Sequence, residues 1–189
     1  SDVCSSDLAK WMASGHLAVI SFDPASLLNN KVEELQELGE LHHYPHALLG
    51  DGQPATLYAT LDAEKGSTLK PLPEEQQPEY LRDKLKILAE LPINTVRLDD
   101  IEGLPSVDVL VLDDLHDAMK VLENGEQTLK NTLLIQVKVA FQPTHERQPN
   151  LAELQHWASR NGFRFFTIQS LKSHSYISDC MLDEDGQAG

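Results

Sequence analysis

The chain has 189 residues, of which 41% are hydrophobic and 24% are charged, and this balance is typical of a globular protein with a core. Asp and Glu total 30 against 15 Lys and Arg, so the formal net charge is -15. This excess of negative charge argues against non-specific nucleic-acid binding and against docking on an anionic membrane surface. No run of the sequence approaches the roughly 20 apolar residues of a transmembrane helix.

The cysteine content and the first residues bear on the cellular context. Cys4 and Cys180 are too few for a disulfide framework or a Cys-rich zinc site, which favours a cytoplasmic location. No signal peptide is recognisable. Residues 1–8, SDVCSSDL, are similar to a translated reading frame of a sequencing adapter, so we expect a non-native tail rather than an ordinary polar N-terminus. On that interpretation natural sequence begins near Ala9, and the segment before it is missing.

The first part of the chain predicts two strands around a helix. Residues 17–22, LAVISF, are an apolar run that predicts a buried parallel strand ending at Asp23 and Pro24. Leu and Val residues at helical spacing predict a helix over 25–38, which Gly39 ends. A second strand is expected over 41–49.

The middle of the chain gives a less regular pattern. Alternation over 55–61 predicts an edge strand, and the polar residues 62–79, with three prolines, predict a long exposed loop that is either functional or mobile. Residues 81–91 fit a helix or a strand equally well. Residues 95–98 predict a strand that ends at Asp99.

The last part again alternates strands and helices. The run VDVLVL over 107–112 is the clearest buried strand, followed by a helical pattern over 117–129 and a strand over 133–141. Asn150 with Glu153 three residues later predicts a capped helix over 151–160. Aromatic residues predict a last strand over 163–168. We expect one domain over 9–172 and a flexible acidic tail over 173–189.

This alternation predicts an α/β fold with a mostly parallel sheet and helices on both faces. In such sheets ligands bind at the carboxyl ends of the strands. Asp23 and Asp113 each follow a predicted strand, so each is a candidate ligand-binding acid. The alternative is that each acid only opens a turn or caps the next helix.

Several short motifs occur in a characteristic order: FDP over 22–24, ALLGD over 47–51, TVRLDDI over 95–101, DVLVLD over 108–113, FQPTHERQP over 141–149 and NGFRF over 161–165. With them, residues 17–170 resemble the FkbM-type methyltransferases, which use S-adenosylmethionine and have a Rossmann-like sheet. The resemblance implies O-methylation of a hydroxyl or carboxylate on a small molecule or sugar.

The resemblance also implies roles for individual acids. Asp23 matches the acid that holds the ribose of the methyl donor, and Asp51 matches a residue near the adenine pocket. Asp113 matches an acid near donor and acceptor. Asp99 and Asp100 match a motif that we expect to be structural or close to the site.

The chain departs from the family pattern on the acceptor side. Leu115, His116 and Ala118 stand where the family usually has Gln, Gly and Glu, and Lys138 stands where a Glu is usual. His145 replaces a frequent Tyr. These changes remove a possible general base, and Asp113 or Asp114 is left as the candidate catalytic acid. The family's first strand and its Gly-rich loop are missing from the sequence as given.

Two functions therefore stay open. The chain is either part of an FkbM-like methyltransferase with a degenerate acceptor site, or a non-catalytic module for binding or interaction. In both cases we expect the chain alone to be inactive and to bind S-adenosylmethionine weakly or not at all. The sequence leaves the acceptor and the oligomeric state open.

Two further constellations were weighed for chemistry. His42, His43 and His46 invite a metal site, but neighbouring residues of a strand point to opposite faces, so we expect polar histidines and no metal. Cys180 with His145 could form a nucleophilic pair. The absence of an orienting turn around Cys180 favours a free thiol.

Overall fold

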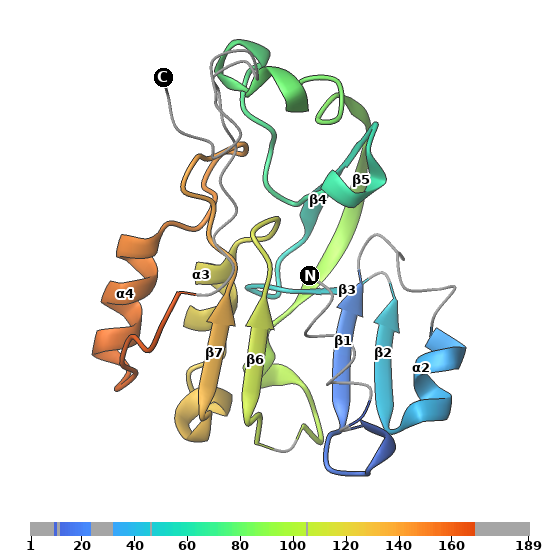
Figure 1. Cartoon of the computed structure of the whole chain (residues 1–189), viewed down its shortest axis with the longest axis vertical. Helices are drawn as coiled ribbons and strands as arrows, with labels where there is room; N and C mark the ends of the chain where they lie inside the picture. Colours follow the sequence, from blue (N-terminus) through green and yellow to red (C-terminus); the bar gives the residue numbers. More distant parts are fainter. Residues whose placement is uncertain (1–9, 11, 24–31, 46, 105, 169–189) are drawn as a thin grey trace, which may run out of the picture.

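A computed structural model describes residues 10, 12–23, 32–45, 47–104 and 106–168 of the chain. Figure 1 shows a mixed α/β arrangement with few helices. The strands are β1 (Val19–Asp23), β2 (Leu41–Pro45), β3 (Ala47–Leu49), β4 (Ala55–Thr60), β5 (Ile87–Val96), β6 (Val109–Leu112) and β7 (Leu134–Val137). The helices are α2 (Val32–Leu38), α3 (Ala118–Glu123) and α4 (Leu151–Arg160), with 3₁₀ turns η1 (Ala63–Lys65), η2 (Glu74–Gln76), η3 (Glu79–Leu81), η4 (Leu98–Asp100) and η5 (Thr128–Asn131).

The strands form three small sheets instead of the single, mostly parallel sheet that the sequence predicts. β1 pairs with β2 and β6 pairs with β7, both in parallel. The third sheet has the order β3-β5-β4, in which β4 runs antiparallel to β5 at one edge. The arrows of β1, β2, β6 and β7 point the same way in Figure 1. Parallel pairing and the edge position of β4 are therefore confirmed, whereas a continuous parallel sheet is wrong for the described residues.

The main hydrophobic core lies on one face of the β6–β7 pair. Leu110 points into it, together with Val121 and Leu122 of α3 and Leu154 and Trp157 of α4, all 8% exposed or less. Phe22 of β1 packs against the same cluster. One core thus joins β1 to β6, although the two strands belong to different sheets.

The other face of this pair lacks the helices that the sequence predicts on both sides. Val109 and Val111 alternate with Leu110 along β6 and are 49% and 64% exposed. Parallel sheets normally bury both faces. Within the described part of the chain, α3 and α4 pack on the opposite face from these two valines, so the prediction of helices on both faces is not met at β6–β7.

The predicted strand over 41–49 is two strands in different sheets. β2 ends at Pro45, and β3 begins at Ala47 and pairs with β5 instead of β1. A proline has no backbone N–H to donate to a strand ladder, which favours a break at this point. The sequence analysis placed one strand here because apolar residues continue on both sides of the proline.

The last strand that the sequence predicts, over 163–168, is not formed. Residues 163–168 form no strand, and Phe165 and Phe166 are 60% and 86% exposed. Gly162, with a φ of 82°, turns the chain after α4, and the Phe163 N–H donates to the Ala158 carbonyl at 2.9 Å. Phe163 then stacks on Trp157 with ring centroids 5.7 Å apart. The first aromatic of the run is therefore used to close a helix end.

Other predictions are confirmed with shifted bounds. α4 begins after Asn150, whose side chain accepts a hydrogen bond from the Glu153 N–H, as the sequence predicts. The ambiguous stretch 81–91 ends in β5, a strand that begins at Ile87. The helical pattern over 117–129 gives only α3 and, after a turn at Gly125, the short η5. Residues 25–31 of the predicted first helix lie outside the described residues, and α2 contains the rest.

Candidate functional site

The candidate acids lie where two parallel strands end. β1 ends at Asp23, and Asp113 directly follows β6. Because both arrows point the same way in Figure 1, the two strands end toward the same edge of the molecule, as the alternation of strands and acids predicts. Only the backbone of Asp23 is described, so the proposed ribose-binding carboxylate lies outside the described part of the structure.

Asp113 stabilises the turn that follows β6. Its Oδ1 accepts a hydrogen bond from the Leu115 N–H at 2.9 Å, and its Oδ2 lies 3.8 Å from Nε2 of His116. The side chain is 51% exposed. This contact agrees with the alternative in which the acid opens a turn, and it still leaves part of the carboxylate in solvent.

Asp114 is more enclosed and is paired with a cation. Its side chain is 16% exposed, and its Oδ1 lies 2.6 Å from Nζ of Lys138, which follows β7. Its backbone carbonyl accepts a hydrogen bond from Nε2 of Gln148 at 2.8 Å. One oxygen of this enclosed carboxylate is therefore occupied by the lysine.

Two histidines lie beside these acids. Nδ1 of His116 shares a hydrogen bond with Thr68 Oγ1 at 3.3 Å. Burial lowers the pKa of His116, although the negative charges of Asp113 and Asp114 act to raise it. His145 is 1% exposed, and burial lowers its pKa to about 4, although Asp114 acts in the opposite direction. Both imidazoles are therefore neutral at pH 7.

From the sequence alone, His116 and His145 stand out only as departures from a family pattern. Contacts from Ser67 and Thr68, in the predicted loop, to the same region are visible only in the structure. A signal was present: Ser67, Thr68 and Leu69 interrupt the charged residues of that loop with small and apolar side chains. Such a change is typical of a segment that packs against the protein.

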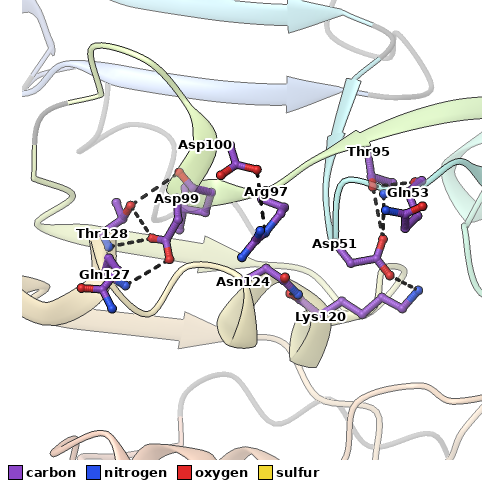
Figure 2. A network of polar contacts seen from close by, with 11 residues as sticks. Asp51, Gln53, Thr95, Arg97, Asp99, Asp100, Lys120, Asn124, Gln127 and Thr128 are labelled. Carbon is purple, nitrogen blue, oxygen red and sulfur yellow. Dashed lines mark hydrogen bonds and ion pairs between the residues drawn. The ribbon is translucent and has the colours of Figure 1, made fainter.

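Asp51 follows the turn after β3 and is held by neighbours from two other elements. Figure 2 shows Lys120 of α3 reaching toward it, and its Nζ lies 2.9 Å from Asp51 Oδ2. The other oxygen accepts hydrogen bonds from the Gln53 N–H at 3.1 Å and from Thr95 Oγ1 at 3.5 Å. The hydrogen bond from Lys120 is the main cause that lowers the pKa of Asp51, while burial acts against it. The acid matched to the adenine pocket is thus already engaged.

Asp99 has a structural role. Its carboxylate accepts hydrogen bonds from the Thr128 N–H and Oγ1, both at 2.8 Å, and from the Gln127 N–H at 3.2 Å (Figure 2). Burial acts to raise the pKa of Asp99, but these donors outweigh it and the pKa lies below its ordinary value. Asp100 is exposed and lies 3.8 Å from Nε of Arg97. The expectation that these two acids are structural or close to the site agrees with these contacts.

A cavity lies at the other end of β1 and β2 from the candidate acids. This cavity of about 410 Å³ is lined by Leu17, Ala18, Gly39 and Glu40, which precede β1 and β2. It therefore lies at the opposite end of these strands from Asp23. Asp51, the acid matched to the adenine pocket, is paired with Lys120, so a ligand at this carboxylate would have to compete with that contact.

Two further searches concern metals and membranes. Among the residues that the structure describes, no group of three His, Cys, Asp or Glu side chains is arranged to hold a metal ion. Within the same residues, no helix has the length and apolar character needed to cross a membrane. Of the three histidines weighed as ligands, His46 lies outside the described residues, while His42 bonds to Glu40 and His43 to Ser21.

The chain was also compared with known proteins. No family model, no curated protein and no solved structure matches it.

Proposed function

We propose that this chain is part of an S-adenosylmethionine-dependent methyltransferase domain of the FkbM kind, located in the cytoplasm, in which the acceptor side no longer supports catalysis. The methyl acceptor of such a domain is a small molecule or a sugar. The proposal includes a Rossmann-like sheet, of which β1–β2 and β6–β7 would be two parallel parts. One observation carries it: β1 and β6 run in the same direction, share a core through Phe22 and Leu110, and end at acids.

The ion pair at the end of β6 supports the loss of catalysis. Removal of a proton from the acceptor hydroxyl requires a general base, such as a free carboxylate or imidazole, within hydrogen-bond distance of that hydroxyl. Asp114 is paired with Lys138, and His145 is buried. The side chain of Asp113 is half-exposed, but it also holds the turn at Leu115. Loss of a positioned general base costs roughly 10²–10⁴ in rate.

The contacts of Asp51 support weak donor binding. A charged hydrogen bond contributes roughly 1.5–3 kcal/mol, whereas micromolar affinity requires about 8 kcal/mol. Asp51 would first have to give up its 2.9 Å contact with Lys120. We therefore expect the chain to show no micromolar affinity for S-adenosylmethionine.

A titration of the chain with S-adenosylmethionine by calorimetry tests this expectation, with S-adenosylhomocysteine as a second ligand. No heat of binding is expected up to millimolar ligand. A dissociation constant in the micromolar range, lost in Asp51→Asn, would mean that the donor site is complete in this chain and that the expectation of weak donor binding is wrong.

A second candidate is a non-catalytic binding or interaction module. The pairing of both Asp51 and Asp114 with lysines favours it, because neither acid is free for a ligand. The two candidates differ in whether a first strand and a Gly-rich loop can complete a donor site on this chain. Micromolar donor binding by the chain extended with such a segment supports the methyltransferase-type domain, and no binding by the extended chain supports the module.

A further inference from the structure

The connection between β4 and β5, which the sequence predicts as a long exposed loop over 62–79, has only 3₁₀ turns, but some of its residues are buried against the rest of the chain. We use the name strap for residues 63–85. At its base the Leu61 N–H donates to the Lys86 carbonyl at 2.9 Å, and the Asp62 N–H donates to the Lys84 carbonyl at 3.1 Å. These bonds tie the two ends of the strap together. Ser67 is also paired with Tyr58 of β4 through two backbone hydrogen bonds of 2.8 and 3.2 Å, so the part of the strap that can open lies beyond Ser67.

The first part of the strap contacts the turn after β6. The Ser67 hydroxyl donates to the Leu115 carbonyl, and Thr68 Oγ1 lies 3.3 Å from Nδ1 of His116. Ser67 is fully buried and Leu69 is 5% exposed. The strap is therefore bonded to the two residues that follow Asp114.

A second set of bonds joins the strap to the segment before α4. The Leu72 N–H donates to the Thr144 carbonyl at 2.9 Å, and the Glu146 N–H donates to the Lys70 carbonyl at 2.8 Å. Pro71 and His145 are paired between these two bonds. His145 thus lies at the centre of the contact, 1% exposed.

The surroundings of His145 suit a neutral imidazole. Its Nδ1 bonds with Thr144 Oγ1 at 2.9 Å, and its Nε2 has no hydrogen-bond partner among the described residues. Of the charged and titratable groups that face it, Lys65 in the strap and His116 repel a proton, while Asp114 attracts one. Asp114 is already paired with Lys138, and Asp113 faces His116. A buried cation without an acceptor is costly, so a proton on His145 would oppose the closed contact.

We propose that the strap is a lid over the acids at the end of β6, that it stays closed while His145 is uncharged, and that it is released when His145 takes up a proton. That Asp113 and Asp114 form the acceptor side rests on the proposed function. The release of the strap does not depend on that function. In the closed state burial holds the pKa of His145 at about 4, against an ordinary value of 6.5 once the strap is open. Linkage then makes opening about 30-fold more favourable at pH 5 than at pH 7.5.

Amide hydrogen exchange in the complete chain tests the lid, with rates corrected for the intrinsic effect of pH. In the wild type, strap amides such as Leu72 are expected to be less protected than amides of β7 at both pH values, and their protection should fall about 30-fold from pH 7.5 to pH 5. Equal protection of the two sets would mean that the strap opens only when the whole chain unfolds, which contradicts the lid. His145→Gln carries no proton at either pH and should keep the same strap protection at both. His156→Gln, on the exposed side of α4, is the control and should behave as the wild type does.

Two further outcomes overturn the lid: strap protection in the wild type that does not change with pH, or an equal fall in the wild type and in His145→Gln. If His145→Gln does not fold, titration of the wild type by NMR replaces it. The signal of His145 and the loss of strap protection should then follow a common pH dependence, and a different dependence contradicts the proposal. No donor or acceptor is present in these experiments, so failure of the proposed function would not change their result.

Discussion

Nζ of Lys138, directly after β7, lies 2.6 Å from Oδ1 of Asp114, two residues after β6. The ends of two paired parallel strands are thus joined by an ion pair at the place where ligands bind in α/β sheets. Lys138 is 63% exposed and Asp114 only 16%. The pair is therefore asymmetric, and its loss should cost more when the enclosed carboxylate is the partner left behind.

The ion pair predicts an unequal response to substitution. Lys138→Met should lower the free energy of unfolding by about 1–2 kcal/mol, because it leaves an enclosed carboxylate without its cation. Asp114→Asn should cost less, since the exposed lysine stays hydrated. Urea unfolding of the two single variants and of the double variant gives the coupling energy, which should lie near 0.5–1 kcal/mol.

Lys86→Met, at an exposed position, is the control and should stay within about 0.5 kcal/mol of the wild type. A coupling energy of zero between Asp114 and Lys138 would show that the pair does not hold the carboxylate.

Asp99 should contribute to stability far more than its neighbour Asp100. Asp99→Ala removes the acceptor of three hydrogen bonds from Gln127 and Thr128 and should cost about 1–2 kcal/mol. Asp100→Ala removes only an exposed contact with Arg97 and should cost under about 0.5 kcal/mol. Thermal unfolding of both variants measures the difference, and equal shifts would contradict the role given to Asp99.

The pH dependence of this contribution has a definite sign. The pKa of Asp99 is lowered in the folded chain. Its stabilisation is therefore complete above the ordinary aspartate value of 3.8 and is lost as the pH falls toward the folded value. The gap in stability between wild type and Asp99→Asn should narrow below about pH 4.

His145 should also make the chain less stable in acid, and this loss should begin at a higher pH than the loss due to Asp99. Its pKa is about 4 in the folded chain and 6.5 in an unfolded one, so the unfolded state takes up the proton first. Stability should fall as the pH drops below 6.5, and by about 2 kcal/mol at pH 5 from this group alone. Urea unfolding of the wild type and of His145→Gln at several pH values measures the contribution of His145 to stability. The same pH dependence of the free energy of unfolding in both proteins would contradict this prediction.

Gly125 is predicted to be intolerant of a side chain. A Cβ there would lie 2.7 Å from Cδ2 of Leu98, which is 3% exposed in the core, and 3.1 Å from the Val121 carbonyl. Gly125→Ala should therefore cost about 1–3 kcal/mol through overpacking. In a Leu98→Ala background the same substitution should cost less, because the space is then free; an equal cost in both backgrounds would point to the backbone instead.

Features that depend on residues close together in the sequence could be predicted, whereas features that depend on tertiary packing could not. The cap of Asn150 on Glu153 and the strand before Asp113 depend on residues within a few positions of each other. The run 163–168 was expected to pair as a strand because of its aromatics, but packing of Phe163 on Trp157 decides its conformation. Propensity is weaker than tertiary packing for such short segments.

The candidate site shows the same division. That acids follow β1 and β6 can be read from the sequence alone. That Asp51 is paired with Lys120, and Asp114 with Lys138, depends on residues 69 and 24 positions apart that only the fold brings together. The strap was expected to be a loop because its prolines and charges are typical of loops, whereas its small buried residues bond to the turn at Leu115.

Methyl transfer itself tests most directly the claim that this chain does not support catalysis. The chain is incubated with S-adenosylmethionine carrying a labelled methyl group and with a panel of sugars and hydroxy acids, beside Asp114→Asn. The account predicts that labelled product stays at the level of the protein-free control for both proteins, because donor binding is weak and Lys138 holds Asp114, the enclosed acid that follows β6. Product formed by the wild type and lost in Asp114→Asn would contradict it.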